Sequence, residues 1–116
     1  MIVTTSKKTQ LQMVRGTSQL IEIRVTGPDG APYTLLEGDV IRFGVKYHEE
    51  RPDYLLKKES TELTGGVTRI ALEPEDTAEL ECGVYKFDIG LQTGEQYLSV
   101  VPYSDFVLLP NITGKE

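Results

Sequence analysis

Residues 80–91 decide the fold, and they read Leu80-Glu81-Cys82-Gly83-Val84-Tyr85-Lys86-Phe87-Asp88-Ile89-Gly90-Leu91. From Tyr85 onward every second residue is apolar, and the residues between are charged or glycine. This alternation has the period of a β-strand, in which successive side chains point to opposite faces of a sheet. It predicts a strand whose buried face carries Tyr85, Phe87, Ile89 and Leu91.

Tyr85 has a second expected role, because its position relative to Leu80 and Gly83 is the spacing of a tyrosine corner. In Greek-key sandwiches, a tyrosine near the start of the penultimate strand returns its hydroxyl to the backbone upstream and so fixes the crossover between the sheets. We expect Leu80 to fill the core beneath the ring and Gly83 to relax the turn. This structural role is favoured over a ligand-binding or catalytic role for Tyr85.

The same alternation recurs along the chain. Residues 21–25 and 41–47 are the clearest further strands, the second with Ile41, Phe43, Val45 and Tyr47 on one face. Five weaker segments are rich in β-branched or aromatic residues. They are residues 9–14, 54–59, 67–72, 96–101 and 105–109. The total of about eight short strands is typical of a sandwich or a barrel.

Turn-forming residues separate these segments. Residues 27–30 combine a proline of fixed φ with Gly30, which can adopt a positive φ, and so predict a tight turn. Thr93-Gly94 joins two strands closely enough to predict a hairpin over residues 84–101. Only residues 74–80 look helical, with a proline suited to the first helical position, and they predict about two turns at most.

Length and composition favour one domain with one core. The chain has 116 residues, of which 39% are hydrophobic and 26% charged, as in an ordinary globular protein. We therefore expect a single all-β sandwich over residues 1–116, with frayed ends at residues 1–8 and 114–116. The predicted core consists of Ile21, Ile23, Val25, Ile41, Phe43, Val45, Ile70, Leu72, Leu80, Tyr85, Phe87, Ile89 and Phe106.

Charge and cysteine content argue against several classes of protein. With 12 Lys and Arg against 18 Asp and Glu, the net charge is −6, which disfavours nucleic acid as a partner. No apolar segment has the length of a secretory signal or a membrane span, so we expect a soluble protein without a membrane partner. The single cysteine, Cys82, cannot form an intrachain disulfide, and we expect it to be a small, partly buried apolar side chain.

No set of residues predicts catalysis, a metal site or a cofactor. The one histidine, His48, lies beside Glu49, Glu50 and Asp53 in an expected loop, but no second histidine exists to complete a metal site or a catalytic set. An acidic run lacks the spacing of a calcium loop and is expected to be a solvated negative face. It consists of Glu73, Glu75, Asp76, Glu79 and Glu81. We expect a protein that is not an enzyme.

An ordered series of short motifs runs through nearly the whole chain. The series comprises Val25-Thr26, Gly27-Pro28-Asp29-Gly30-Ala31-Pro32-Tyr33, Leu36-Glu37-Gly38-Asp39-Val40, Ile41-Arg42-Phe43-Gly44-Val45-Lys46, Ile70-Ala71-Leu72-Glu73-Pro74-Glu75-Asp76-Thr77-Ala78-Glu79-Leu80, Gly83-Val84-Tyr85-Lys86-Phe87-Asp88-Ile89, Phe106-Val107-Leu108 and Asn111-Ile112-Thr113. In this order it resembles the immunoglobulin-like domains of phage and prophage tail proteins, of the type at the N-terminus of baseplate upper proteins.

This resemblance implies an immunoglobulin-like, two-sheet Greek-key β-sandwich of about seven to eight strands. It also implies a structural or docking role in the tail, baseplate or head of a virion. The expected partners are other virion or tail proteins, with self-association as a further option. The expected location is the virion, or the bacterial cytoplasm before assembly.

A carbohydrate-binding sandwich is the alternative, because exposed aromatic rings on a sheet can stack on sugars. The chain has six tyrosines and no tryptophan, the broadest stacking surface. With Tyr85 assigned to the corner, the candidates are Tyr33, Tyr47, Tyr54, Tyr97 and Tyr103. Two or three exposed, coplanar rings without packing support would favour this alternative, and scattered inward rings would count against it.

Overall fold

Two β-sheets and one short helix make up the part of the chain that the structure, a computed structural model, describes, namely residues 10–27, 30–47 and 54–112. The elements in chain order are β1 (Leu11–Val14), β2 (Gln19–Arg24), β3 (Val40–Lys46), β4 (Leu56–Ser60), β5 (Val67–Leu72), α1 (Pro74–Thr77), β6 (Gly83–Thr93) and β7 (Gln96–Leu109). The predicted all-β class is therefore confirmed. The expected frayed ends, 1–8 and 114–116, lie outside the described residues.

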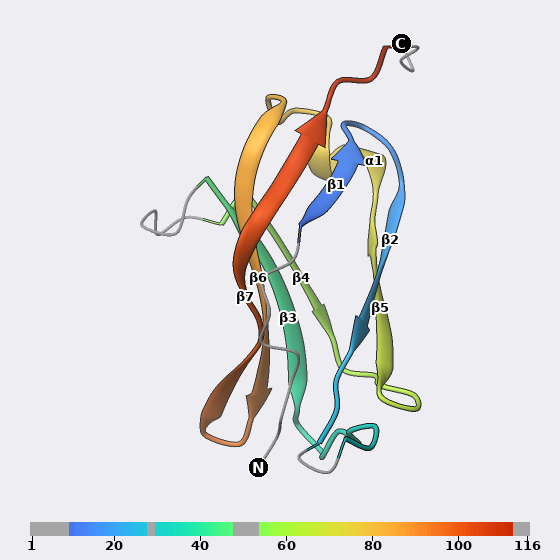
Figure 1. Ribbon diagram of the computed structural model, residues 1–116, viewed down its shortest axis with the longest axis vertical. Coiled ribbons are helices and arrows are strands. Elements are labelled where there is room, and N and C mark those ends of the chain that lie inside the picture. The colour runs from blue at the N-terminus through green and yellow to red at the C-terminus, as the bar shows by residue number, and fades with distance from the viewer. Residues whose placement is uncertain (1–9, 28–29, 48–53, 113–116) are drawn as a thin grey trace.

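The strands form one sheet of five, in the order β1-β7-β6-β3-β4, and one sheet of two, β2-β5. All neighbouring strands are antiparallel except β1 and β7, which run parallel with Leu11 opposite Phe106 and Val14 opposite Leu109. The smaller sheet packs over the inner face of the larger one (Figure 1). The result is a two-layer β-sandwich with the core between its sheets.

The core lies where the alternation places it. Twelve of the thirteen predicted core residues are buried, and the exception is Leu80, which is only partly buried. Leu80 follows α1 in the turn toward β6 and packs against the core from its border, so the prediction for it is confirmed in part. Thr77 of α1 is fully buried. Five further core residues are Met13, Leu56, Leu91, Val100 and Leu108.

The three phenylalanines of the chain form the centre of this core. The ring centroid of Phe43 lies 5.7 Å from that of Phe87 and 6.4 Å from that of Phe106. Phe87 and Phe106 meet edge to face at 6.4 Å. Because these rings come from β3, β6 and β7, their contacts hold the middle of the five-stranded sheet together.

The tyrosine corner is confirmed. Tyr85 is 4% exposed, and its hydroxyl donates a hydrogen bond to the carbonyl oxygen of Glu81. Burial, and then the proximity of Tyr47 and Glu81, raise the pKa of the Tyr85 hydroxyl. The expectation of a partly buried Cys82 is wrong, because this residue lies exposed in the bend that precedes β6.

The hairpin of β6 and β7 is longer than the sequence predicts. Thr93 pairs with Gln96 across a two-residue loop, and Gly94 has a φ of +58° at the first loop position, as in a type II′ turn. The two separate strands expected at 96–101 and 105–109 are one strand, β7. The pairing register shifts on either side of Ile89, so bulges carry β7 past Pro102 without ending it.

The predicted helix is shorter than expected, covering 74–77 rather than 74–80. Its start is fixed because the Asp76 carboxylate accepts a hydrogen bond of 2.7 Å from the backbone N–H of Glu73. The predicted tight turn at 27–30 is supported at both described ends. Gly30 donates its backbone N–H to the carbonyl of Gly27 at 3.0 Å and has a φ of +81°.

Candidate functional site

Three of the five candidate tyrosines gather on the outer face of the five-stranded sheet. Tyr54, Tyr97 and Tyr103 are 49%, 53% and 42% exposed, and they border two adjoining hollows on that face. We call this surface, with the outward residues of β3 and β6 between the rings, the tyrosine face. These three rings are exposed and lie together, but the carbohydrate-binding alternative also asks for rings without packing support.

The other two candidates do not contribute to the tyrosine face. Tyr33 is partly buried, and its hydroxyl donates a 3.0 Å hydrogen bond to Oδ2 of Asp39, which also accepts the backbone N–H of Leu36. Burial and this carboxylate raise the pKa of Tyr33. The ring of Tyr47 packs against that of Tyr85 with 5.5 Å between centroids. Both side chains therefore have packing roles in the structure.

Glycines form the floor under two of the three rings. A methyl group at Gly44 would lie 2.5 Å from Cε1 of Tyr54, and a methyl group at Gly90 would overlap the hydroxyl end of Tyr97. Neither glycine has a positive φ, so the backbone conformation does not require glycine at these positions. Glycine is needed because an aromatic ring occupies the space where a side chain would begin. Aromatic rings that cover strand glycines in this way support the sheet. The rings thus have packing support as well as exposed surface.

Asp88 lies at the centre of the tyrosine face, opposite Gly44 in the β3–β6 register and next to the bulged part of the β6–β7 pairing. The larger hollow beside it has a volume of about 190 Å³ and is bordered by Arg42, Tyr54, Lys57, Asp88 and Tyr97. We call it the tyrosine hollow. A smaller hollow of about 90 Å³ lies toward Lys46, Lys86 and Tyr103. Bulges often occur next to functional sites, where they redirect side chains.

Cations outnumber anions around the tyrosine hollow. Arg42 and Lys57 contribute two positive charges, and Asp88 contributes one negative charge. Nε of Arg42 contacts the carboxylate of Glu59 at 2.9 Å, outside the hollow's border. Nζ of Lys57 lies 5.1 Å from the ring centroid of Tyr54, and Nζ of Lys46 lies 4.7 Å from it. This local excess of positive charge stands out on a chain of net charge −6.

The pKa values of Asp88 and Tyr97 are shifted by burial and by the charges that surround the tyrosine hollow. Burial raises the pKa of Asp88, and the positive charge of Lys46 opposes this shift. Burial also raises the pKa of Tyr97, as do the negative charge of Asp88 and the nearby Tyr54, while Arg42 opposes the change. Asp88 and Tyr97 are therefore close enough to sense each other, and Tyr97 stays protonated and able to donate a hydrogen bond at neutral pH.

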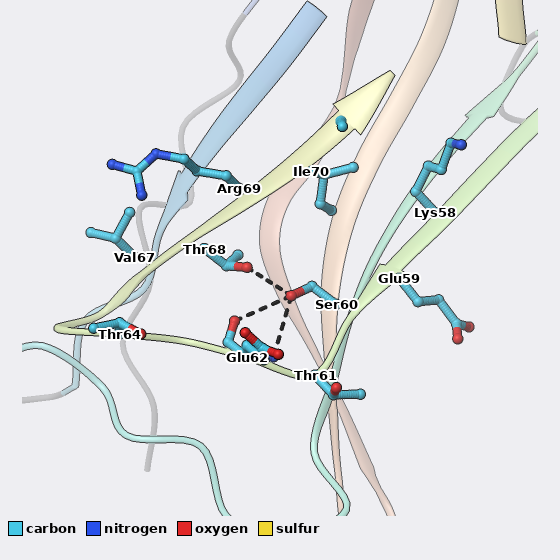
Figure 2. Close-up of a pocket in the computed structure, with 11 residues that line it drawn as sticks. Lys58, Glu59, Ser60, Thr61, Glu62, Thr64, Val67, Thr68, Arg69 and Ile70 are labelled. Carbon is cyan, nitrogen blue, oxygen red and sulfur yellow. Dashed lines mark hydrogen bonds between the residues drawn. The ribbon is translucent and has the colours of Figure 1, made fainter. Parts of the chain in front are cut away.

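A second opening lies between the outer strands of the two sheets. This β4–β5 cavity has a volume of about 550 Å³ and is lined by residues 58–62 and by residues of β5. Figure 2 shows Thr68 and Ile70 pointing from β5 toward β4, whereas Arg69 points away. The hydroxyls of Ser60 and Thr68 are 2.7 Å apart and link the two sheets at one end of the cavity. Nζ of Lys58 contacts Asp76 of α1 at 3.0 Å.

The edge of β5 that faces away from β2 has no partner among the described strands. Val67 exchanges both backbone hydrogen bonds with Thr64, at 2.9 and 3.0 Å, although Arg24 is its partner in the β2 register. Its backbone groups therefore point away from β2. Because this direction alternates along an antiparallel strand, the N–H and C=O groups of Arg69 and Ala71 point to the same free edge.

Only part of the enzyme-like candidate set falls within the described residues. His48, Glu49, Glu50 and Asp53 lie outside the described residues. In the acidic run, Asp76 is engaged by Lys58 and by the Glu73 backbone. No group of three or more His, Cys, Asp or Glu side chains among the described residues is placed to hold a metal ion. Nor does the described part contain a helix with the length and hydropathy needed to cross a membrane.

Sequence reasoning did not identify the tyrosine hollow, although it placed several of the hollow's residues on the outward faces of their strands. The alternation assigns Gly44 and Gly90 to solvent-facing positions, where glycine is unusual because it weakens a strand. Two outward glycines in a chain rich in tyrosine were the available signal. Their pairing with Tyr54 and Tyr97 required the strand register and the path of the chain into β4.

Comparison with family models and with curated protein sequences assigns no function to the tyrosine hollow or to the β5 edge. No protein-family model matches the chain, and no curated protein sequence matches it.

Proposed function

We propose that this protein is a non-enzymatic docking module of a phage or prophage virion, acting through protein–protein contacts in the tail, baseplate or head. The observation that carries the proposal is the free edge of β5, beside which the β4–β5 cavity provides space for side chains of a partner. Unpaired backbone groups on an edge strand can bind an extended segment of another chain by β-strand addition. The partner is another virion protein, or a second copy of this chain.

The strand order supports the finer fold expected from the family resemblance. In immunoglobulin-like sandwiches, the second and fifth strands pair in one sheet, while the two strands of the last hairpin belong to the other sheet. Here β2 pairs with β5, and β7-β6-β3-β4 form the opposing sheet. The tyrosine corner also falls where this fold has it, between β5 and the start of β6. We therefore assign an immunoglobulin-like Greek-key topology as part of the proposal.

Mass spectrometry of purified phage particles tests the virion role. Particles are induced from the source strain and purified on a density gradient, and the major capsid protein serves as the internal control. We expect this chain at a fixed ratio to the capsid protein. Abundant capsid protein without this chain would contradict the virion role for that particle.

Two variants of one edge residue test the docking surface. Ala71→Lys places a charge at the free edge and Ala71→Pro removes an outward N–H, so both hinder strand addition. We expect particles from the variant phages to contain at least tenfold less of this chain, while the isolated variants keep the wild-type circular dichroism spectrum. Leu20→Lys, at an exposed site on β2, is the matched control. Normal incorporation of both Ala71 variants would exclude this edge as the contact.

Carbohydrate binding is the second candidate function, and a specific observation favours it. Tyr54, Tyr97 and Tyr103, each about half exposed, lie together on one sheet face around a carboxylate. Aromatic rings and a few polar groups at a shallow hollow are the typical elements of a sugar-binding surface. A glycan array with the wild-type protein tests this candidate, and absence of binding to every glycan on the array would refute it.

A further inference from the structure

We propose that the tyrosine hollow is a binding site for an acidic sugar residue of a glycan. This inference rests on the second candidate function above and specifies the site and the class of sugar. It is carried by three properties of the hollow: an exposed ring beside it, a hydrogen-bond acceptor at its centre, and more positive than negative charge on its border.

Tyr97 is the stacking surface in this site. The residue is 53% exposed, and its hydroxyl end lies over Gly90, so the sheet supports one side of the ring. Tyr54, in contrast, has the ammonium groups of Lys46 and Lys57 within 4.7 and 5.1 Å of its centroid. The C–H groups of a pyranose therefore have better access to Tyr97, and Tyr54 forms the opposite wall.

Asp88 supplies the polar contact to hydroxyl groups. An ionised carboxylate only accepts hydrogen bonds, and sugar hydroxyls are donors that can satisfy it. Within the part of the chain that the structure describes, no ion pair closer than 4.0 Å involves Asp88. Its position opposite Gly44 places Asp88 beside the Tyr54 ring that covers this glycine, and Asp88 borders both hollows of the tyrosine face.

The charge of the border selects an acidic sugar over a neutral one. Arg42 uses Nε for Glu59 and Nη1 for Gln92, and a guanidinium has five N–H donors, so three are not used by these partners within the described part of the chain. Lys57 has no ion pair among the described residues. A sugar carboxylate held between Arg42 and Lys57 would be stabilised by the charge of Lys57 and by the remaining donors of Arg42, whose charge Glu59 partly balances, while the sugar hydroxyls face Asp88.

The test uses matched pairs of oligosaccharides that differ only in a carboxylate, namely oligogalacturonate against oligogalactose and oligoglucuronate against oligoglucose. Binding is followed by tyrosine fluorescence, since the chain has no tryptophan, and by isothermal titration calorimetry. We expect binding of an acidic member with at least tenfold higher affinity than its neutral counterpart. Equal affinity for the two members would overturn the charge selectivity.

Variants locate the site. We expect Tyr97→Ala and Lys57→Ala each to lower the affinity at least tenfold, and Tyr97→Phe, which keeps the ring, to change it less than threefold. Arg24→Ala, which removes a charge from the opposite sheet, is the control and should leave the affinity unchanged. All variants are checked for an unchanged circular dichroism spectrum and melting temperature.

The outcomes separate the site from the function on which it rests. If the wild-type protein binds no oligosaccharide in these pairs and no glycan on an array, carbohydrate binding itself is refuted. If the wild-type protein binds but the folded Tyr97→Ala and Lys57→Ala variants bind equally well, the function stands and the tyrosine hollow is excluded. Loss of binding in both variants with retention in Arg24→Ala supports the proposed site.

Discussion

The hydroxyl of Tyr85 donates a hydrogen bond to the carbonyl oxygen of Glu81, four residues earlier in the chain, and so fixes the bend that leads from α1 into β6. Tyr85→Phe removes only this hydroxyl. Because the bond is partly buried, we expect the free energy of unfolding to fall by about 1 kcal/mol. Chemical denaturation measures the change, and Tyr97→Phe, at a residue that is 53% exposed, is the control and should leave stability unchanged. Equal stability of Tyr85→Phe and the wild type would show that the bond contributes nothing.

Phe87 lies 2% exposed between Phe43 and Phe106 in the centre of the core. Phe87→Ala removes a ring that contacts two others and leaves a cavity, which should lower the free energy of unfolding by about 3 to 5 kcal/mol. Thermal and chemical denaturation check this value. Val84→Ala, at a 59% exposed position of the same strand, is the matched control. A Phe87→Ala protein that melts within a degree or two of the wild type would contradict the burial.

Ser60 and Thr68 join the outer strands of the two sheets through hydroxyls 2.7 Å apart. Since Thr68 is 5% exposed, Ser60→Ala should leave its hydroxyl without this partner, at a cost of about 1 to 3 kcal/mol. The double variant with Thr68→Val removes both hydroxyls and should recover part of that loss. A double-mutant cycle by urea denaturation measures the coupling. Additive effects of the two changes would mean that the hydroxyls do not interact.

The lowered pKa of Asp76 predicts how the free energy of unfolding depends on pH. Burial alone would raise its pKa, but the Glu73 N–H and the Lys58 ammonium outweigh burial and lower the pKa below the ordinary value of 3.8. A pKa that is lower in the folded state contributes stability above pH 3.8, and this contribution is lost as the pH falls through the folded value. We expect Asp76→Asn to reduce stability at pH 7 and to flatten the pH dependence below pH 5. Parallel curves for the variant and the wild type would contradict this linkage.

Gly90 and Gly66 should respond differently to the same substitution. In Gly90→Ala the new methyl group meets the hydroxyl end of a flexible side chain, Tyr97, which can move, so we expect a change within about 0.5 kcal/mol. In Gly66→Ala it meets the backbone oxygen of Val25 at 2.9 Å, at a φ of +78°, so we expect a loss of about 1 to 3 kcal/mol. Denaturation of both variants measures the contrast. Similar losses would mean that Tyr97 cannot move away.

Much of the fold follows from local patterns in the sequence. Alternation places Ile21, Phe43 and Phe87 in the core because a strand with one buried face must bury every second residue. The tyrosine corner is equally local, since Tyr85 and Glu81 are only four residues apart. The sequence predicts two strands, at 96–101 and 105–109, but bulges in the pairing with β6 let β7 continue through Pro102. Bulges depend on the partner strand, so the local sequence does not predict them.

The candidate site is harder to predict because its residues come from separate strands. Tyr97 reaches Gly90 across the β6–β7 hairpin, and Tyr54 reaches Gly44 from the segment before β4. Each strand pattern gives the outward direction of its glycine, but not which ring covers it. That pairing depends on strand order and register, which a single sequence does not determine locally.

The parallel pair of β1 and β7 has a mechanical consequence. Tension applied at Leu11 and Leu109 would pull the two strands in opposite directions along their length, because they run parallel and pair side by side. Such a load shears the strands, so the evenly spaced backbone bonds between them must break together and not one after another. The first and last strands thereby act as a clamp that resists tension applied to these two strands.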